Sequence, residues 1–272
     1  MRIFLTGRGG QVGWELERTL SALGEVVATD RRTLDLADAD AIKRVMRDAK
    51  PDLIVNAGAY TAVDKAEAER ELATQVNAVA PGMLAEEAKR LGALLVHYST
   101  DYVFDGAKAL PYDEDDAPSP LSHYALTKLQ GERAIQAAGC RHLILRTSWV
   151  YSPRATNFYR VILSRAQANE PMRMVDDQTS VPTPSAFVAQ YTGALIAKNA
   201  EGLLHLVPSG HATRYEFALE VVKTSGSRSA VTAVKTDAFP SPARRPAFSV
   251  LDNRRAGAAL GAGLPDWKSV LP

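Results

Sequence analysis

The chain of 272 residues carries 32 basic and 31 acidic side chains, and its formal net charge is +1 at pH 7. Apolar residues make up 46% and charged residues 23% of it, which excludes intrinsic disorder and allows a sizeable core. The balanced charge excludes a general field for nucleic acid or an anionic membrane, so we expect neither as a partner.

The cysteine content and the apolar stretches restrict the class further. Cys140 is the only cysteine, which excludes an internal disulfide framework and a zinc site of several cysteines. No stretch reaches the roughly 18 apolar residues of a membrane-spanning helix. The start, MRIFLTGRGG, meets glycines too early for a secretory signal. These features predict a soluble, cytoplasmic protein.

Amphipathic segments alternate with short apolar runs through the first two-thirds of the chain. Gly24, Gly92 and Gly139 each stand between such a segment and an apolar run. Because glycine accepts the left-handed conformation that ends helices, each is predicted to be a helix-to-strand joint. The alternation predicts an α/β fold, a Rossmann-like doubly wound parallel sheet with helices on both faces.

After about residue 150 prolines interrupt this pattern. The sequence there predicts strands at 172–175 and 203–207, a helix at 185–198, a further helix after the capping box Thr213–Glu216, and a loop at 239–246. We therefore expect a smaller, discontinuous C-terminal domain. Residues 1–150 with about 184–207 are assigned to a dinucleotide-binding Rossmann domain, and 151–183 with 208–272 to a substrate-binding domain.

A glycine-rich turn follows the first predicted strand, Arg2–Thr6. Gly7, Gly10 and Gly13 allow a tight turn, the approach of a pyrophosphate, and close packing of helix on strand. The second strand ends at Asp30, about 20 residues further on, where a ribose-binding acid is expected. The alternative is a glycine turn with a surface aspartate, but strand, helix and acid together favour a dinucleotide.

The residues after Asp30 bear on the choice of cofactor. Asp30 suits the free ribose hydroxyls of NAD, whereas Arg31 and Arg32 suit the 2′-phosphate of NADP. We expect NADPH as the cofactor, with NADH tolerated.

Tyr124 and Lys128 are predicted to lie one turn apart on a helix that begins near Leu121. A neighbouring ammonium lowers the pKa of a phenol, which can then exchange a proton with a carbonyl. Thr100 follows a central strand, at the sheet edge where ligands of such folds bind, and is placed to polarise the same carbonyl. The alternatives are an ordinary amphipathic helix, and a turn that Ser99 and Thr100 merely cap.

Several longer stretches carry a resemblance to a known family. They are GQVGWEL at 10–16, VNAGAYTAVDKAE at 55–67, HYSTDYVF at 97–104, RTSWVY at 146–151 and PARRP at 242–246. With the glycine turn and the tyrosine–lysine pair, the chain resembles the extended short-chain dehydrogenases/reductases and, among them, the family of dTDP-4-dehydrorhamnose reductases.

The resemblance implies roles for particular residues. The catalytic triad would be Thr100, Tyr124 and Lys128, and the substrate contacts Thr100, Asp101 and Trp149. Cofactor contacts would fall on Gly10, Gln11, Val12, Asp30, Asp35, Leu36, Ala59, Tyr60, Thr61, Tyr98, Tyr124 and Lys128, to which the turn and the corner after the second strand add Gly7, Gly13 and Arg31.

The implied reaction is the NAD(P)H-dependent reduction of the 4-keto group of dTDP-6-deoxy-L-lyxo-4-hexulose to dTDP-L-rhamnose. Trp149 would form an apolar wall for the sugar, or else a core aromatic. Asp101 would bind sugar hydroxyls, or else cap a loop. Arg244 and Arg245 would meet the substrate diphosphate, or else form an exposed basic loop.

Two positions depart from the family pattern. Ala125 stands where relatives often have glycine. Glu15 matches a glutamate that binds magnesium between the subunits of some relatives, but Ala186 stands where a second carboxylate would be expected. We therefore expect no structural metal, and a monomer or weak homodimer.

Two other functions stay open from the sequence. One is another nucleotide-sugar reductase or an epimerase, because the turn and the tyrosine–lysine pair do not separate these enzymes. The other is a non-catalytic binding subunit, similar to the regulatory subunit of methionine adenosyltransferase, because fold alone does not establish chemistry.

Overall fold

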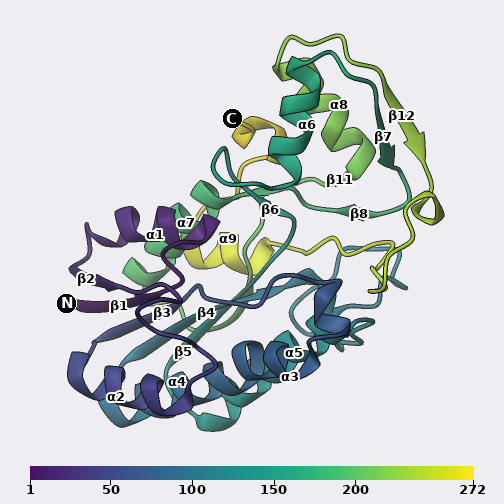
Figure 1. The fold of residues 1–272 in the computed structure, drawn as a ribbon. Coiled ribbons are helices and arrows are strands. Elements are labelled where there is room, and N and C mark those ends of the chain that lie inside the picture. Colours follow the sequence, from purple (N-terminus) through teal and green to yellow (C-terminus); the bar gives the residue numbers. More distant parts are fainter.

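The computed structural model describes residues 1–272 and is built on a six-stranded sheet (Figure 1). Every strand pairs in parallel with its neighbours, in the order β10-β5-β4-β3-β1-β2. The strands are β1 (Arg2–Thr6), β2 (Glu25–Ala28), β3 (Leu53–Asn56), β4 (Leu94–Thr100), β5 (His142–Thr147) and β10 (Gly202–His205). The chain moves outward from β1 to β2 and then crosses to β3 on the other side of β1. The predicted Rossmann-like sheet is confirmed.

Helices cover both faces of the sheet (Figure 1). One face packs against α1 (Gln11–Leu20), α7 (Ser185–Ala197) and α9 (Arg254–Leu260). The other packs against α2 (Ala39–Ala49), α4 (Ala80–Leu91) and α5 (His123–Ala138), with α3 (Arg70–Thr74) and a π-helical turn (Gln75–Val79) beside them. Within β1, Ile3 and Leu5 enter the first core and Phe4 enters the second, as the two-residue period of a strand requires.

The glycine joints divide into two kinds. Gly92 and Gly139 end α4 and α5 with φ of 69° and 67°, as predicted. The left-handed conformation predicted for Gly24 is wrong, because Gly24 is not among the residues with positive φ. A Cβ at Gly24 would instead lie 2.0 Å from the carbonyl oxygen of Met1, so a close backbone contact requires glycine there.

A smaller part lies above the carboxyl ends of the strands (Figure 1). It contains α6 (Phe158–Gln167) and α8 (Arg214–Thr224), packed around their own core with Phe217 at its centre. Short strand pairs complete it: β6 (Val150–Tyr151) with β9 (Thr183–Pro184), β7 (Met172–Val175) with β12 (Val231–Val234), and β8 (Thr179–Ser180) with β11 (Ala212–Thr213). The capping box at the start of α8 is confirmed, because the side chains of Thr213 and Glu216 each accept the predicted backbone N–H.

We propose that the two parts are the two domains expected from the sequence. One boundary differs from that expectation, which placed 208–272 wholly in the smaller domain. α9 contacts α7 and β10, and Ala256 and Leu264 belong to the core on the sheet, so the chain returns to the larger part near its end.

Short 3-10 helices complete the fold: Lys65–Glu67, Asp101–Val103, Thr236–Ala238 and Trp267–Val270. No helix combines the length and the apolar character needed to cross a bilayer.

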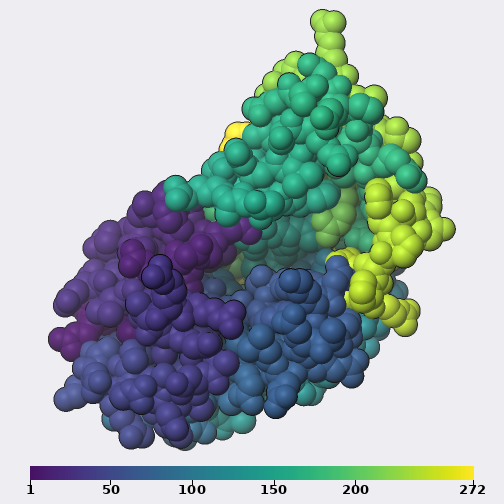
Figure 2. Space-filling model, viewed as in Figure 1, coloured from purple at the N-terminus to yellow at the C-terminus, as the bar shows by residue number.

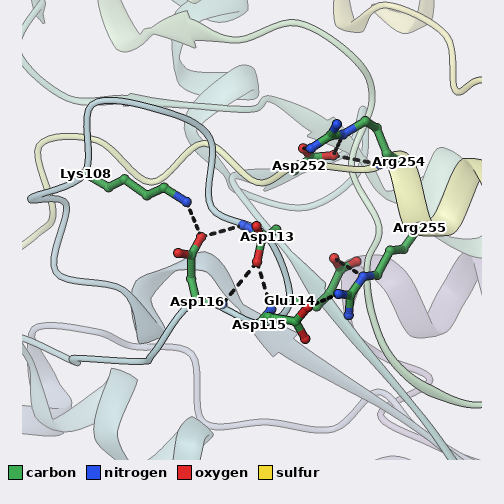
Figure 3. A network of polar contacts seen from close by, with 8 residues as sticks. All are labelled: Lys108, Asp113, Glu114, Asp115, Asp116, Asp252, Arg254 and Arg255. Carbon is green, nitrogen blue, oxygen red and sulfur yellow. Dashed lines mark hydrogen bonds and ion pairs between the residues drawn. The ribbon is translucent and has the colours of Figure 1, made fainter.

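An ion-pair network fastens the loop after β4 to α9 (Figure 3). Glu114 is buried, and its carboxylate accepts the backbone N–H of His205 in β10 at 2.9 Å while Arg255 lies 3.5 Å away. Arg255 also pairs with Asp115, and Lys108 pairs with Asp116. The network therefore fixes the path of the chain between the end of β4 and the start of α5.

Candidate active site

A cleft of about 910 Å³ opens at the carboxyl ends of the strands, between the sheet and the smaller part (Figure 2). It lies where the strand order reverses, between β1 and β3, which is the position at which open α/β sheets bind ligands. Of the predicted catalytic, cofactor-binding and substrate-binding residues, all but Gly13 line this cleft. Arg244 and Arg245, which were considered for the substrate diphosphate, do not line it. The fold thus gathers nearly all of the predicted residues here, together with other residues that the sequence did not single out.

The backbone of the glycine turn is packed so closely that Gly7 and Gly13 have no space for a side chain. Gly7 has φ of 74°, and a Cβ on it would lie 2.6 Å from the amide nitrogen of Gly58. A Cβ on Gly13 would lie 2.0 Å from the carbonyl oxygen of Gly7, so Gly13 allows α1 to approach the turn without itself lining the cleft. Gly10 caps α1 without a side-chain hydrogen bond, which leaves the first amides of the helix available to an anion.

The corner after β2 carries one acid and two exposed arginines. The Asp30 carboxylate accepts the backbone N–H groups of Arg32 at 2.9 Å and Thr33 at 3.1 Å, and these hydrogen bonds lower its pKa. They use Oδ1, so Oδ2 has no partner within the chain. Arg31 lies 3.8 Å from Asp35, and Arg31 and Arg32 both line the cleft.

The loop after β3 is held from behind by Asn77, which the sequence did not single out. Its buried amide accepts the N–H of Tyr60 at 2.8 Å and donates to the carbonyl oxygen of Tyr60 at 3.0 Å. The Tyr60 hydroxyl donates to Glu69 at 2.8 Å. The expected contact residues 59–61 are therefore fixed in the cleft wall.

Lys128 is buried at the base of the cleft. α5 begins at His123 rather than near Leu121, with Ser122 as its N-cap, and places Tyr124 and Lys128 one turn apart. The Lys128 ammonium donates to the carbonyl oxygen of Tyr98 at 2.6 Å and lies 3.2 Å from Nε2 of His97. Burial lowers the pKa of Lys128 to about 8.

The pKa of Tyr124 departs from the sequence-based expectation. We expected Lys128 to lower it, but burial of the phenol raises it, and a hydrogen bond with Thr100 opposes the rise only in part. The reason is geometric: the Lys128 ammonium points at Tyr98 and His97 rather than at the phenol. In this structure Tyr124 is therefore a protonated phenol throughout the neutral range.

Thr100 and Asp101 lie beside Tyr124. Thr100 Oγ1 accepts the N–H of Tyr102 at 3.1 Å, so the capping role left open above applies, and the same hydroxyl donates to Asp101 at 3.1 Å. The Asp101 carboxylate is buried and accepts from Ser180 at 2.9 Å and Ser249 at 2.5 Å. Burial raises the pKa of Asp101 to about 6. Asp101 therefore ties three distant segments together.

Trp149 forms part of the cleft wall with φ of 39°, a conformation that few non-glycine residues adopt. Its ring is half-buried and contacts the guanidinium of Arg214, whose carbon lies 4.3 Å from the ring centre. Arg245 instead pairs with Asp64 at 2.8 Å, and Arg244 is exposed.

Three buried polar atoms of the cleft have no hydrogen-bond partner: Gln11 Oε1, Ser99 Oγ and Thr147 Oγ1. Buried polar atoms in proteins are nearly always paired, so these atoms fit a polar ligand. Together with the glycine turn and Asp30 they match a dinucleotide. Ser99 and Thr147 were not predicted as contacts, although both lie in stretches that carry the family resemblance.

No group of three or more His, Cys, Asp or Glu side chains gathers at a spacing suited to a metal ion. Glu15 lies on α1 and Ala186 in the first turn of α7, the helix that packs against α1.

The family follows from comparison with known proteins. The model of the RmlD substrate binding domain matches residues 1–272, the whole chain. The chain belongs to the RmlD family. A dTDP-4-dehydrorhamnose reductase of Burkholderia thailandensis is 42% identical to it, over 98% of this chain and 96% of the relative. The reductase of Escherichia coli K12 is 41% identical, over 98% and 95%.

Solved structures agree with this membership of the RmlD family. A dTDP-4-dehydrorhamnose reductase from Clostridium acetobutylicum superposes with a TM-score of 0.94 at 35% identity, covering 99% of this chain and 96% of the other. The reductase from Bacillus anthracis, solved in complex with NADP, gives 0.94 at 30% identity, over 98% and 96%. A UDP-glucose 4-epimerase from Thermus thermophilus, at 22% identity and a TM-score of 0.82, shares the fold alone.

Proposed function

We propose that this protein reduces the 4-keto group of dTDP-6-deoxy-L-lyxo-4-hexulose to give dTDP-L-rhamnose, with a nicotinamide cofactor. Its relatives of 42% and 41% identity are dTDP-4-dehydrorhamnose reductases over nearly their full length. The observation that carries the proposal is the meeting of Thr100, Tyr124 and Lys128 in the one cleft that also holds the glycine turn.

Each residue of this group has a distinct task. When bound, the nicotinamide supplies the hydride that the keto carbon accepts. Tyr124 donates its proton to the carbonyl oxygen, and because burial keeps the phenol protonated it is in the form that a reduction requires. Thr100, whose hydroxyl proton is directed at Asp101 in this structure, would donate that proton to the same oxygen when the substrate is bound. Lys128, anchored by the Tyr98 carbonyl, holds the ribose hydroxyls of the cofactor.

The other cleft residues are assigned by position. Gly7, Gly10, Gln11 and Val12 would face the pyrophosphate at the start of α1, and Gly13 keeps that helix close. Asp30, Asp35 and Leu36 would lie at the adenosine end, residues 59–61 and Tyr98 along the wall, and Trp149 beside the sugar, since all of them line the cleft. Asp101 is assigned to holding Thr100 in place rather than to the sugar, because its carboxylate is already bonded.

We assign NADPH as the preferred cofactor, with NADH tolerated. Arg31 and Arg32 are exposed at the cleft corner and present guanidinium groups suited to a 2′-phosphate. A relative from Bacillus anthracis was solved with NADP.

Replacing both arginines with alanine is expected to raise KM for NADPH by about 10–100-fold, the value of hydrogen bonds to a charged group. KM for NADH, which lacks the 2′-phosphate, should change little. Steady-state kinetics with both cofactors measure the effect, and an equal rise for NADH would contradict the assignment.

The lowered pKa of Lys128 predicts a pH dependence. The ammonium is present below about pH 8 and is lost above it, so kcat/KM for NADPH should fall as pH rises through 8. The variant Lys128→Met should have lower turnover, weaker cofactor binding and no such fall. A wild-type profile that stays flat to pH 10 would argue against Lys128 as a cofactor ligand.

The direct test is NADPH oxidation after addition of the keto sugar nucleotide, with the sugar product identified by NMR. Reduction to the rhamnose configuration supports the proposal. An epimerase would instead carry tightly bound NAD and consume no NADPH. A binding subunit would be inert and would copurify with a larger enzyme.

A further inference from the structure

Three arginines of the chain are not exposed: Arg146, Arg214 and Arg245. Arg146 pairs with Glu132 at 2.7 Å, and Arg245 pairs with Asp64 at 2.8 Å. Arg214 has no carboxylate within ion-pair distance. Arg214 is thus the one arginine of the chain that is at least partly buried and has no carboxylate as an ion-pair partner.

Arg214 is the first residue of α8, which belongs to the smaller part above the carboxyl ends of the strands (Figure 1). Its guanidinium lies against Trp149 at 4.3 Å and Phe158 at 5.0 Å, measured from its carbon to the ring centres. Nη2 donates to the Tyr102 hydroxyl at 3.4 Å. Trp149 and Tyr102 both line the cleft, so the guanidinium lies directly behind two residues of the cleft wall, although Arg214 does not itself line the cleft.

The orientation of the guanidinium is fixed from behind. Nε donates to Oε1 of Gln178 at 3.2 Å, and Gln178 is held in turn by donating to Thr236 at 3.0 Å. Nη1 has no partner within the chain. Burial removes part of the hydration of a cation, which costs free energy. Hydrogen bonds to neutral groups offset this cost less well than an ion pair with a bound anion would.

We propose that Arg214 binds the diphosphate of the sugar nucleotide. The diphosphate is the group next to the sugar in such a substrate, and a planar guanidinium with a free N–H edge matches its oxygens. The inference rests on the proposed function. It replaces the sequence-based hypothesis for Arg244 and Arg245, since Arg245 already pairs with Asp64 and Arg244 is exposed.

The test is calorimetric binding of dTDP and of thymidine to the protein saturated with NADP+. Arg214→Met keeps an apolar chain against Trp149 and Phe158 but removes the charge. It should raise Kd for dTDP about 10–100-fold and leave Kd for thymidine unchanged, because only dTDP carries the diphosphate. Arg214→Lys keeps the charge without the planar fork and should give an intermediate Kd.

Arg244→Met is the matched control, since it removes the same charge from an exposed position away from the cleft. It should bind dTDP as the wild type does. If Arg214→Met weakens dTDP and thymidine equally, Arg214 only supports the fold and the inference is overturned. If wild type and Arg214→Met bind dTDP equally, the inference alone fails. A wild type that does not bind dTDP overturns the proposed function as well.

Discussion

Tyr124→Phe is expected to lower kcat by about 10²–10⁴-fold, the usual contribution of a general acid. Removing the phenol oxygen removes the proton that is transferred to the keto oxygen in the proposed reaction. The Kd for NADPH should stay nearly unchanged, because the phenol acts mainly in the transition state. Stopped-flow single turnover and fluorescence titration with NADPH measure the two quantities separately.

A matched control for this variant is Tyr191→Phe. Tyr191 lies on α7, packs against Phe187 with the ring centres 4.5 Å apart, and does not line the cleft. It should retain wild-type turnover. Undiminished turnover in Tyr124→Phe would remove Tyr124 from the mechanism, whatever the fold.

Glu132→Ala is expected to give the largest loss of stability, about 3–5 kcal/mol in the free energy of unfolding. Glu132 lies one turn beyond Lys128 on α5, and its carboxylate accepts both Nε and Nη2 of Arg146 at 2.9 and 2.7 Å. Both side chains are almost fully buried, at 2% and 3% exposed. Without the carboxylate, a guanidinium charge would remain unpaired between α5 and β5.

Urea unfolding measures this loss, and Glu201→Ala provides the control. The Arg141–Glu201 pair has a similar separation of 2.8 Å, but its side chains are 56% and 44% exposed. An exposed pair of this kind is worth about 0–1 kcal/mol. Equal losses in the two variants would show that burial does not decide the contribution of the Glu132 pair.

The sheet and the phosphate turn could be predicted from the sequence because local rules determine them. The spacing of glycines, the apolar runs and the acid after β2 each indicate the local backbone structure from residues that are close together in the sequence. The turn requires glycine at positions 7 and 13, because a Cβ there would lie 2.6 and 2.0 Å from backbone atoms.

Features that depend on distant residues could not be predicted. The direction of the Tyr124 pKa shift depends on where the Lys128 ammonium points, and the carbonyl of Tyr98 on another element decides that. Asp101 is held by Ser180 and Ser249, which lie far along the chain from it. Arg214 is an ordinary first residue of a helix until the fold brings Trp149 to it.

The chain passes between the sheet and the smaller part several times, leaving the sheet after β5, rejoining it at α7, leaving after β10 and rejoining at α9. A domain that is joined to another by one flexible linker can rotate widely relative to it. Several connections side by side allow only small rotations of the smaller part relative to the sheet. The spacing between the two walls of the cleft should therefore be set before any ligand arrives. Little free energy of association would then be spent on bringing the walls together.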